Sequence, residues 1–141
     1  LVTVGPVENV PLKLYRYRRH GSSLSARKNL VATNDELFYS FARYIRRTCF
    51  QHLDRPPLLA VCGGREGALH FALQAEPVLA VRVAAGLDQK ALQQLIRDYR
   101  HHRLDGAVIL DNYKHRNTVW RKLAGAGMTH NENLFLFWCR I

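Results

Sequence analysis

Several features that would classify a protein at once are missing from this chain. Its three cysteines are odd in number and form no C-x-x-C pair, which argues against a disulfide framework or a zinc site and favours a reducing, cytoplasmic compartment. No apolar run approaches the roughly 18 residues of a membrane span, and no signal peptide opens the chain. The first residue is Leu1 rather than Met, which suggests a trimmed fragment. We therefore expect no membrane partner and no bound metal of the zinc-site kind.

Acidic residues are also scarce. The 141 residues include 21 lysines and arginines but only 11 aspartates and glutamates, so the formal net charge is +10. No acid lies between Asn9 and Asn34, where six bases occur. Such a surplus favours a polyanionic partner, because each neutralised phosphate releases condensed counterions. Nucleic acid is the favoured partner, with the acidic surface of a protein partner, or a merely solvated face, as the alternatives.

What the chain does contain is a strand–turn–helix–strand pattern from Pro57 to Gly86. Leu58–Cys62 is an apolar run typical of a strand buried on both faces, and it ends at a glycine pair. We expect Gly63, Gly64 and Gly67 to let the backbone turn sharply and to leave free N–H groups at the start of the next helix, which attract anions.

Strands and helices alternate along the rest of the chain, and an apolar fraction of 48% supports one folded domain. A capping box is formed by Thr33 and Glu36, and from there the four-residue repeat of Leu37, Phe41, Ile45 and Cys49 predicts the inward face of a helix. The pattern predicts strands at Pro11–Arg18, Leu58–Cys62, Val78–Val83, Ala107–Leu110 and Leu134–Arg140, and helices at Asp35–Phe50, Glu66–Gln74, Asp88–Arg100 and Asn117–Ala124.

This order predicts a single basic α/β domain over residues 1–141. An N-terminal strand and basic loop would occupy residues 1–33, and an α/β core residues 34–141. Right-handed crossovers between the strands imply a Rossmann-like architecture, with a mainly parallel sheet and flanking helices.

The first candidate site is the turn after Leu58–Cys62. The backbone amides of Gly63 and Gly64 could hold a phosphate while Arg65 supplies charge. The turn matches neither G-x-x-x-x-G-K-[ST] nor G-x-G-x-x-G, so a tight turn without a ligand is an equal alternative.

Asp111 is the second candidate, at the expected carboxyl end of a parallel strand, where such sheets bind ligands. It could hold Mg²⁺, with Glu66 as the nearest residue to complete the site. The alternative, which we favour, is that Asp111 or Asn112 caps the following helix. None of the seven histidines has the spacing of a metal motif, and Cys62 and His70 are expected to pack in the interior.

Aromatic and basic residues are interleaved near the N-terminus. If exposed, this pattern could stack unpaired bases while the arginines hold the backbone, and the predicted helix at Asp35–Phe50 adds further arginines. The alternative is that the tyrosines face the interior. The candidate nucleic-acid contacts are Tyr15, Tyr17, Arg16, Arg18, Arg19, Arg43, Arg46 and Arg47.

From Pro57 to Met128 the chain resembles the Toprim domain of plasmid-type primases and topoisomerases. In that family an acid–glycine pair ends one strand and an Asp-x-Asp pattern that holds magnesium ends another. Here Gly63 stands in place of the acid, Asp111 in place of the first aspartate, and Tyr113 in place of the second. The resemblance implies a DNA-handling domain that has lost metal-dependent catalysis.

A second resemblance is to the ParB/sulfiredoxin fold, which includes plasmid partition and fertility-inhibition proteins. It rests on the region from Gly63 to Arg82, which is similar to a G-E-R-R box followed by a P-V-x-V-R strand. Arg65 fits the box, whereas Gly64 and Glu66 depart from it. Both resemblances imply DNA handling on a mobile element.

These observations favour binding over catalysis: a nucleic-acid-binding accessory or degenerate domain of a DNA- or RNA-processing protein. Two alternatives remain. One is a Mg²⁺-dependent nuclease or nucleotide hydrolase that uses the turn from Gly63 to Gly67 together with Asp111. The other is a protein-interaction subunit whose basic face docks on an acidic partner.

Overall fold

The computed structural model describes residues 27–76 and 78–138, with side chains from residue 35 onward. The predicted strand at Pro11–Arg18 and the loop that follows it lie outside these residues. The described elements are α1 (Arg27–Thr48), β1 (Leu58–Gly63), α2 (Arg65–Ala75), β2 (Ala80–Ala85), α3 (Gln89–Arg100), β3 (Gly106–Leu110), α4 (Arg116–Gly125) and β4 (Leu134–Phe137).

The four described strands form one sheet in the order β2-β1-β3-β4, and every neighbouring pair is parallel. β1 lies in the interior of the sheet, where Val61 pairs with Val83 of β2 on one side and with Val108 of β3 on the other. The predicted Rossmann-like α/β fold is therefore confirmed, and within the described residues the sheet is wholly parallel.

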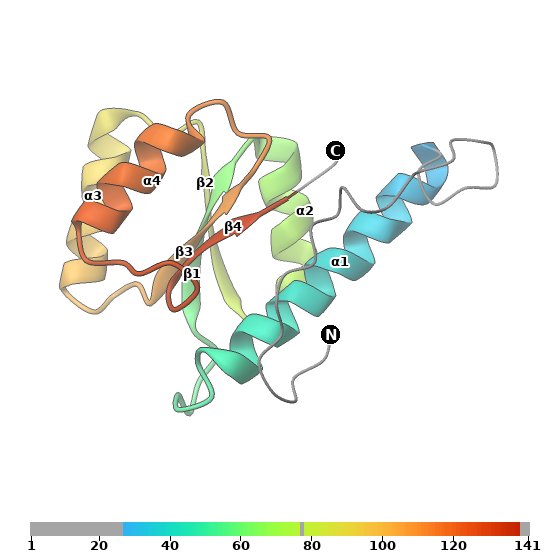
Figure 1. The fold of residues 1–141 in the computed structure, drawn as a ribbon, viewed down its shortest axis with the longest axis horizontal. Helices are drawn as coiled ribbons and strands as arrows, with labels where there is room; N and C mark the ends of the chain where they lie inside the picture. Colours follow the sequence, from blue (N-terminus) through green and yellow to red (C-terminus); the bar gives the residue numbers. More distant parts are fainter. Residues whose placement is uncertain (1–26, 77, 139–141) are drawn as a thin grey trace.

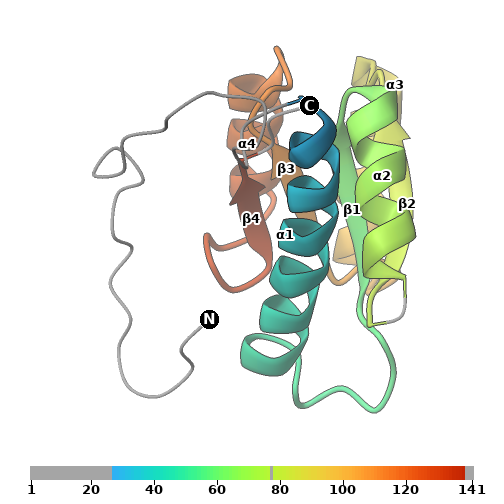
Figure 2. The same ribbon diagram turned by 90° about the vertical axis from the view of Figure 1, so that its right-hand side faces the viewer.

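Two helices cover each face of the sheet, as Figures 1 and 2 show. Alternate residues of β1 divide between the faces: Leu59 and Val61 join the core beneath α1 and α2, and Ala60 and Cys62 join the core beneath α3 and α4. Burial raises the pKa of the Cys62 thiol to about 12, so this cysteine is an inert core residue, as expected.

Local capping signals fix the ends of two helices where the sequence predicted them. Asp88 caps α3, because its Oδ1 accepts a hydrogen bond from the Ala91 N–H at 2.7 Å. Gly127, with φ +109°, follows the last turn of α4, and its N–H donates to the Ala124 carbonyl.

The remaining predicted boundaries hold to within three residues. Predicted Val78–Val83 lies two residues before the observed β2. Predicted Leu134–Arg140 begins where β4 does and runs past its end at Phe137, and its last two residues lie outside the described part of the chain. The other strands and helices that the sequence placed after Pro57 are confirmed.

The start of α1 was predicted wrongly. The helix begins at Arg27, so Thr33 is not its N-cap and the loop assigned to residues 1–33 ends earlier. Asp35, a member of the expected capping box, lies instead 3.5 Å from the Nδ1 atom of His70 on α2. A capping-box residue in a helix interior costs at most about 0.7 kcal/mol relative to alanine, which tertiary packing easily outweighs.

The predicted inward face of α1 is confirmed for Ile45, which is fully buried, and for Phe41 and Cys49, which pack against the same core. It is wrong for Leu37, which is exposed, and it missed the fully buried Phe38 and Ala42. A strict four-residue repeat drifts by about 40° at each step of a helix with 3.6 residues per turn, so Leu37, about 120° round the helix from Cys49, is turned out of the core. Phe38, Ala42 and Ile45 follow one another at intervals of four and then three residues, and this mixed spacing keeps their side chains on the face that packs against the core.

Among the described residues, no helix combines the length and the apolar character needed to cross a membrane.

Candidate phosphate-binding crevice

The carboxyl ends of β1 and β3 lie side by side at the point where the chain changes direction in the sheet. The chain leaves β1 into α2 on one face, and it leaves β3 into α4 on the other. The two loops therefore diverge and leave a crevice between them, which is where open parallel sheets bind ligands.

A pocket of about 540 Å³ fills this position, and we call it the crevice. Its lining carries two cationic side chains, Arg65 and Lys114, both exposed, and no carboxylate. The crevice is therefore suited to an anion rather than to a metal ion. The full lining is Gly63, Gly64, Arg65, Ala85, Gly86, Asn112, Tyr113 and Lys114.

The helices on either side of the crevice begin without a side-chain cap. Gly64 is the N-cap of α2 and has no side chain to offer, and His115 at the N-cap of α4 makes no capping hydrogen bond. The first turn of α4 also contains no acid. Uncapped N–H groups and the helix dipole both favour an anion at these two ends.

The glycines have roles that differ from the predicted sharp turn. Gly63 and Gly67 have ordinary backbone angles, and their role is in packing against Leu110. A Cβ atom at position 63 would lie 2.7 Å from Cδ1 of Leu110, which is too close, and one at position 67 would lie 3.1 Å from it, which a small shift could relieve. Gly64 has φ −62° and open space around the position of a Cβ, so neither strain nor packing demands a glycine there. Among the glycines that line the crevice, only Gly86, with φ +63°, has a backbone conformation that favours glycine.

Tyr113 forms the apolar part of the crevice wall. Its side chain is 7% exposed, and its buried hydroxyl makes no hydrogen bond within the described residues. Burial and then the nearby Cys62 thiol raise the pKa of Tyr113, and the backbone of Leu87 acts in the opposite direction without cancelling the rise. The ring is thus a fixed neutral surface beside the two cations.

The carboxylates proposed for Mg²⁺ do not line the crevice. The Asp111 carboxylate lies 3.8 Å from Nε of Arg116, and Nη1 of the same arginine donates a hydrogen bond to the Asp111 carbonyl at 2.8 Å. Glu66 is exposed on the first turn of α2. His115 rather than Asp111 or Asn112 is the N-cap of α4, so the capping role we favoured for those two residues is wrong. In the described part of the chain, no three Asp, Glu, His or Cys residues gather as metal ligands.

The arginines of α1 divide into two kinds. Arg43 and Arg47 are exposed, and the guanidinium of Arg43 lies 5.6 Å from the ring centroid of Tyr39. Arg46 turns back instead, donating to the carbonyls of Phe50 and Leu53 beyond the end of the helix. Among the α1 arginines whose side chains are described, Arg46 therefore ties down the end of the helix, whereas Arg43 and Arg47 are placed to meet a ligand.

The other predicted nucleic-acid contacts precede α1. Tyr15, Tyr17, Arg16, Arg18 and Arg19 lie outside the described residues, so the structure brings none of them to the crevice.

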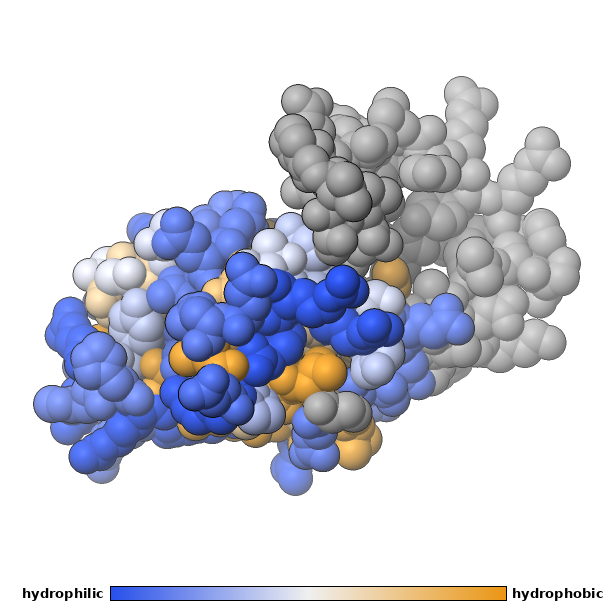
Figure 3. Space-filling view, turned by 90° about the horizontal axis from the view of Figure 1, so that it is seen from below, coloured by the Kyte–Doolittle hydropathy of each residue, from blue (hydrophilic) through white to orange (hydrophobic). Residues whose placement is uncertain are grey.

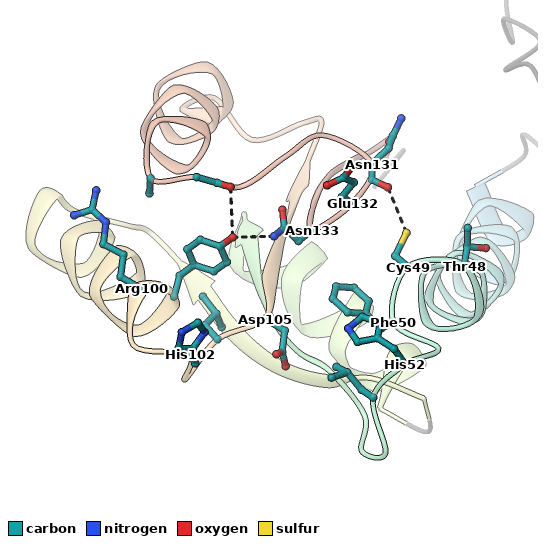
Figure 4. A pocket seen from close by; sticks show the side chains of 15 residues that line it. Thr48, Cys49, Phe50, His52, Arg100, His102, Asp105, Asn131, Glu132 and Asn133 are labelled. Atoms are coloured by element: carbon teal, nitrogen blue, oxygen red, sulfur yellow. Dashed lines mark hydrogen bonds between the residues drawn. The ribbon is translucent and has the colours of Figure 1, made fainter.

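A larger hollow of about 770 Å³ lies at the end of the sheet opposite the crevice, among the residues drawn in Figure 4. Two hydrogen bonds join parts of its lining: the Tyr99 hydroxyl accepts from Nδ2 of Asn133 at 2.9 Å, and the Cys49 thiol donates to the Asn131 carbonyl at 3.3 Å. The lining also includes the carboxylates of Asp105 and Glu132.

Figure 3 views the molecule from this side and shows mainly hydrophilic side chains around small apolar patches. Because two carboxylates are in its lining, whereas the crevice has none, this hollow is less suited to an anion than the crevice.

Sequence reasoning did not single out Lys114 or Gly86 as site residues. Both lie in loops that leave the carboxyl end of a strand: Gly86 directly follows β2, and Lys114 lies four residues after the end of β3. Once a parallel sheet is predicted, that position alone is the signal that would have found them.

Comparisons with protein-family models, with curated proteins and with solved structures find no match to this chain.

Proposed function

We propose that this domain binds nucleic acid, as an accessory or degenerate domain of a DNA- or RNA-processing protein. The observation that carries the proposal is the crevice: Arg65 and Lys114 at the switch point of a parallel sheet, between two uncapped helix starts and with no carboxylate in the lining. A phosphate is the anion best matched to such a site. The net charge of +10 extends the attraction to a polyanion.

The same features favour binding over metal-dependent catalysis. The one strand-end aspartate is paired with Arg116, and a side chain in place of Gly63 would press on the buried Leu110. The Toprim resemblance would place catalytic acids at positions 63 and 113, where this chain has Gly63 and Tyr113. We therefore propose a domain that holds phosphates without cleaving them.

The test is fluorescence anisotropy with labelled single-stranded DNA, duplex DNA and RNA over a salt series, with and without Mg²⁺. The double variant Arg65→Ala/Lys114→Ala should weaken binding at low salt. It should also reduce the slope of log affinity against log salt by about 1.8 for duplex DNA, because each lost phosphate contact removes about 0.9.

The matched control is Arg97→Ala/Arg100→Ala, which removes the same charge from the last turn of α3. An equal effect in both double variants would mean that only net charge matters, and the crevice would be rejected as the binding site. Cleavage of the nucleic acid in the presence of Mg²⁺ would support the nuclease alternative. Absence of salt-dependent binding would leave the basic surface to an acidic protein partner.

A further inference from the structure

β2 is the outermost described strand on one side of the sheet, and apolar side chains border its outer edge. On α2, the helix that packs on this strand, Leu73 is 67% exposed and Leu69 is 44% exposed. Val81 and Val83 of β2 itself are only half-buried. Figure 2 shows α2 and β2 together at one side of the molecule, away from β4. We call the region formed by β2, Leu69 and Leu73 the β2 edge. Large apolar side chains beside an unpaired strand edge favour association.

The two leucines lie on the side of α2 that faces away from α1. Phe71 is fully buried and contacts Phe38 of α1, with ring centroids 5.4 Å apart. Leu69 and Leu73 are each two residues from Phe71, about 200° round the helix, so they point to the opposite side. Phe38 also contacts Phe137, so α1 packs on the β4 side of the sheet. The side of α2 that carries the leucines is therefore the one toward the outer edge of β2.

The backbone of β2 offers hydrogen-bonding groups to a further strand. The Ala80 N–H donates to the Pro57 carbonyl, just before β1. Successive residues of a strand point their N–H and C=O groups to alternate sides, so every second residue from Ala80 faces β1. The backbone groups of Val81, Val83 and Ala85 therefore face the outer edge, and no strand in the described part of the chain pairs with that edge.

Charge favours a second copy of this chain as the occupant of the β2 edge. The net charge of +10 makes two copies repel each other in general. Each of α1, α3 and α4 carries more bases than acids, whereas α2 with its C-cap carries Glu66 and Glu76 against the single base Arg65. The one charged residue of β2, Arg82, is already paired with Asp98 at 2.6 Å. Two copies therefore meet least repulsion when α2 and β2 of one face α2 and β2 of the other.

We propose that the chain forms a two-fold dimer in which β2 pairs antiparallel with β2 of a second copy. The outward-facing groups of Val83 pair with those of Val83 in the second copy, and Val81 pairs in the same way with Ala85 of the second copy. The neighbouring register, centred on Arg82, would place two like charges directly opposite each other, which destabilises a sheet. The register centred on Val83 places Arg82 opposite an alanine, Ala84 of the second copy.

The same arrangement brings the two α2 helices to a normal packing distance. α2 contacts both β1 and β2, so its axis lies roughly half a strand spacing inside β2. With strands about 4.8 Å apart, the two α2 axes come to lie about 10 Å apart, which is within the usual range for packed helices. Leu69 and Leu73 of each copy then cover those of the other. One interface thus uses both the free strand edge and the exposed leucines, and it does not depend on nucleic-acid binding.

Sedimentation equilibrium of the full chain tests the dimer. The sample should be free of nucleic acid and at high salt, where electrostatic bridging between copies is screened. We expect twice the mass of the chain. Leu73→Lys should weaken the dimer by at least about 100-fold, because the substitution occurs twice in the dimer and each should cost about tenfold. Since Leu73 is largely exposed within the chain, the variant should fold.

Leu37→Lys is the matched control, because Leu37 is a leucine of α1 that is 42% exposed and lies away from the β2 edge. This variant should remain as dimeric as the parent. A parent that is monomeric at every concentration would overturn the proposal, and so would assembly beyond a dimer. The proposal would also fail if Leu73→Lys dimerised as tightly as the parent, or if both variants weakened the dimer equally.

Amide hydrogen exchange locates the contact. The Val83 amide should exchange about 100-fold more slowly in the parent dimer than in monomeric Leu73→Lys, whereas the Arg82 amide, which faces β1, should be protected equally in both. A dimer whose Val83 amide exchanges freely would place the contact on another face of the molecule. Protection of Val83 that persists in the monomeric variant would assign the β2 edge to another segment of the same chain. Either result would overturn the proposal.

Discussion

Gly64 is the residue at which stability and the proposed function can be separated. Its backbone angles, φ −62° and ψ 149°, are those of an ordinary N-cap, and a Cβ atom would meet nothing within 4 Å. Asp, Asn, Ser or Thr would each cap α2 better than glycine does. A glycine at a position where a capping side chain would fit leaves the helix start open, which is what an anion site requires.

We predict that Gly64→Asp stabilises the fold and weakens nucleic-acid binding. The new carboxylate would cap α2 and restrict the unfolded chain, which together should raise the free energy of unfolding by about 0.5–1 kcal/mol. It would also place a negative charge where the phosphate is proposed to bind. Urea denaturation and anisotropy on the same preparation measure both effects.

Gly64→Asn is the matched control, since it caps the helix without adding charge. It should be stabilised to a similar extent and should retain more affinity than Gly64→Asp at low salt. Equal affinity in both variants would show that no phosphate approaches the start of α2.

At the scale of the element, α1 combines a buried stripe, a structural arginine and an exposed basic stripe. Tyr39, Arg43 and Arg47 follow one another at intervals of four residues, and all three are exposed. Arg46 lies between them in sequence, but its guanidinium binds the carbonyls of the turn after the helix. A run of arginines in sequence is therefore not a run of equivalent ligand contacts.

This division predicts opposite effects of neighbouring substitutions on α1. Arg43→Ala/Arg47→Ala should change the free energy of unfolding by less than about 0.5 kcal/mol and should lower the salt slope of nucleic-acid binding by up to about 1.8. Arg46→Ala should lower the free energy of unfolding by about 1–2 kcal/mol, because two carbonyls lose a charged donor. An unchanged salt slope in the double variant would remove α1 from the interface.

Considered as a whole molecule, the fold could be predicted from the sequence because its local signals agree with its packing. Apolar runs such as Ala107–Leu110 lie in strands buried on both faces, and Asp88 caps its helix as an aspartate before a helix usually does. The start of α1 could not be predicted, since the capping box at Thr33 gives a valid local signal that packing overrides.

The site was predictable only in part. Gly64 and Arg65, which line the candidate crevice, could be singled out because a glycine turn after a buried strand is visible in sequence. The roles of Gly63 and Gly67 depend on Leu110, more than 40 positions away, and only the packed structure brings that side chain to them. The pairing of Asp111 with Arg116 likewise requires the geometry of the turn.

Two aspartates join distant parts of the molecule through ion pairs. Hydrogen bonds from Arg82 of β2 and from Gln94 lower the pKa of Asp98 on α3. Asp105, before β3, accepts from Arg55 at 2.7 and 3.1 Å and from the Leu58 N–H at 2.7 Å. Burial acts to raise the pKa of Asp105, but these bonds outweigh it, so the pKa lies below its usual value.

The pKa values of Asp98 and Asp105 are lower in the folded than in the unfolded state, so both carboxylates stabilise the fold when they are ionised. This stability is fully present above pH ~4, the pKa of an unfolded aspartate, and it is lost as the pH falls through the folded values. Protonation also increases a net charge that is already +10, which adds repulsion. We therefore expect the free energy of unfolding, measured by urea denaturation, to be level from pH 7 to about 5 and to fall steeply below about 4.

Asp105→Asn should lower the free energy of unfolding by about 1–2 kcal/mol at pH 7 and make its fall at acid pH shallower. Asp54→Asn, at an exposed aspartate, is the control and should follow the parent curve. A parent curve that stays level to pH 3 would contradict a stabilising role for these two ion pairs.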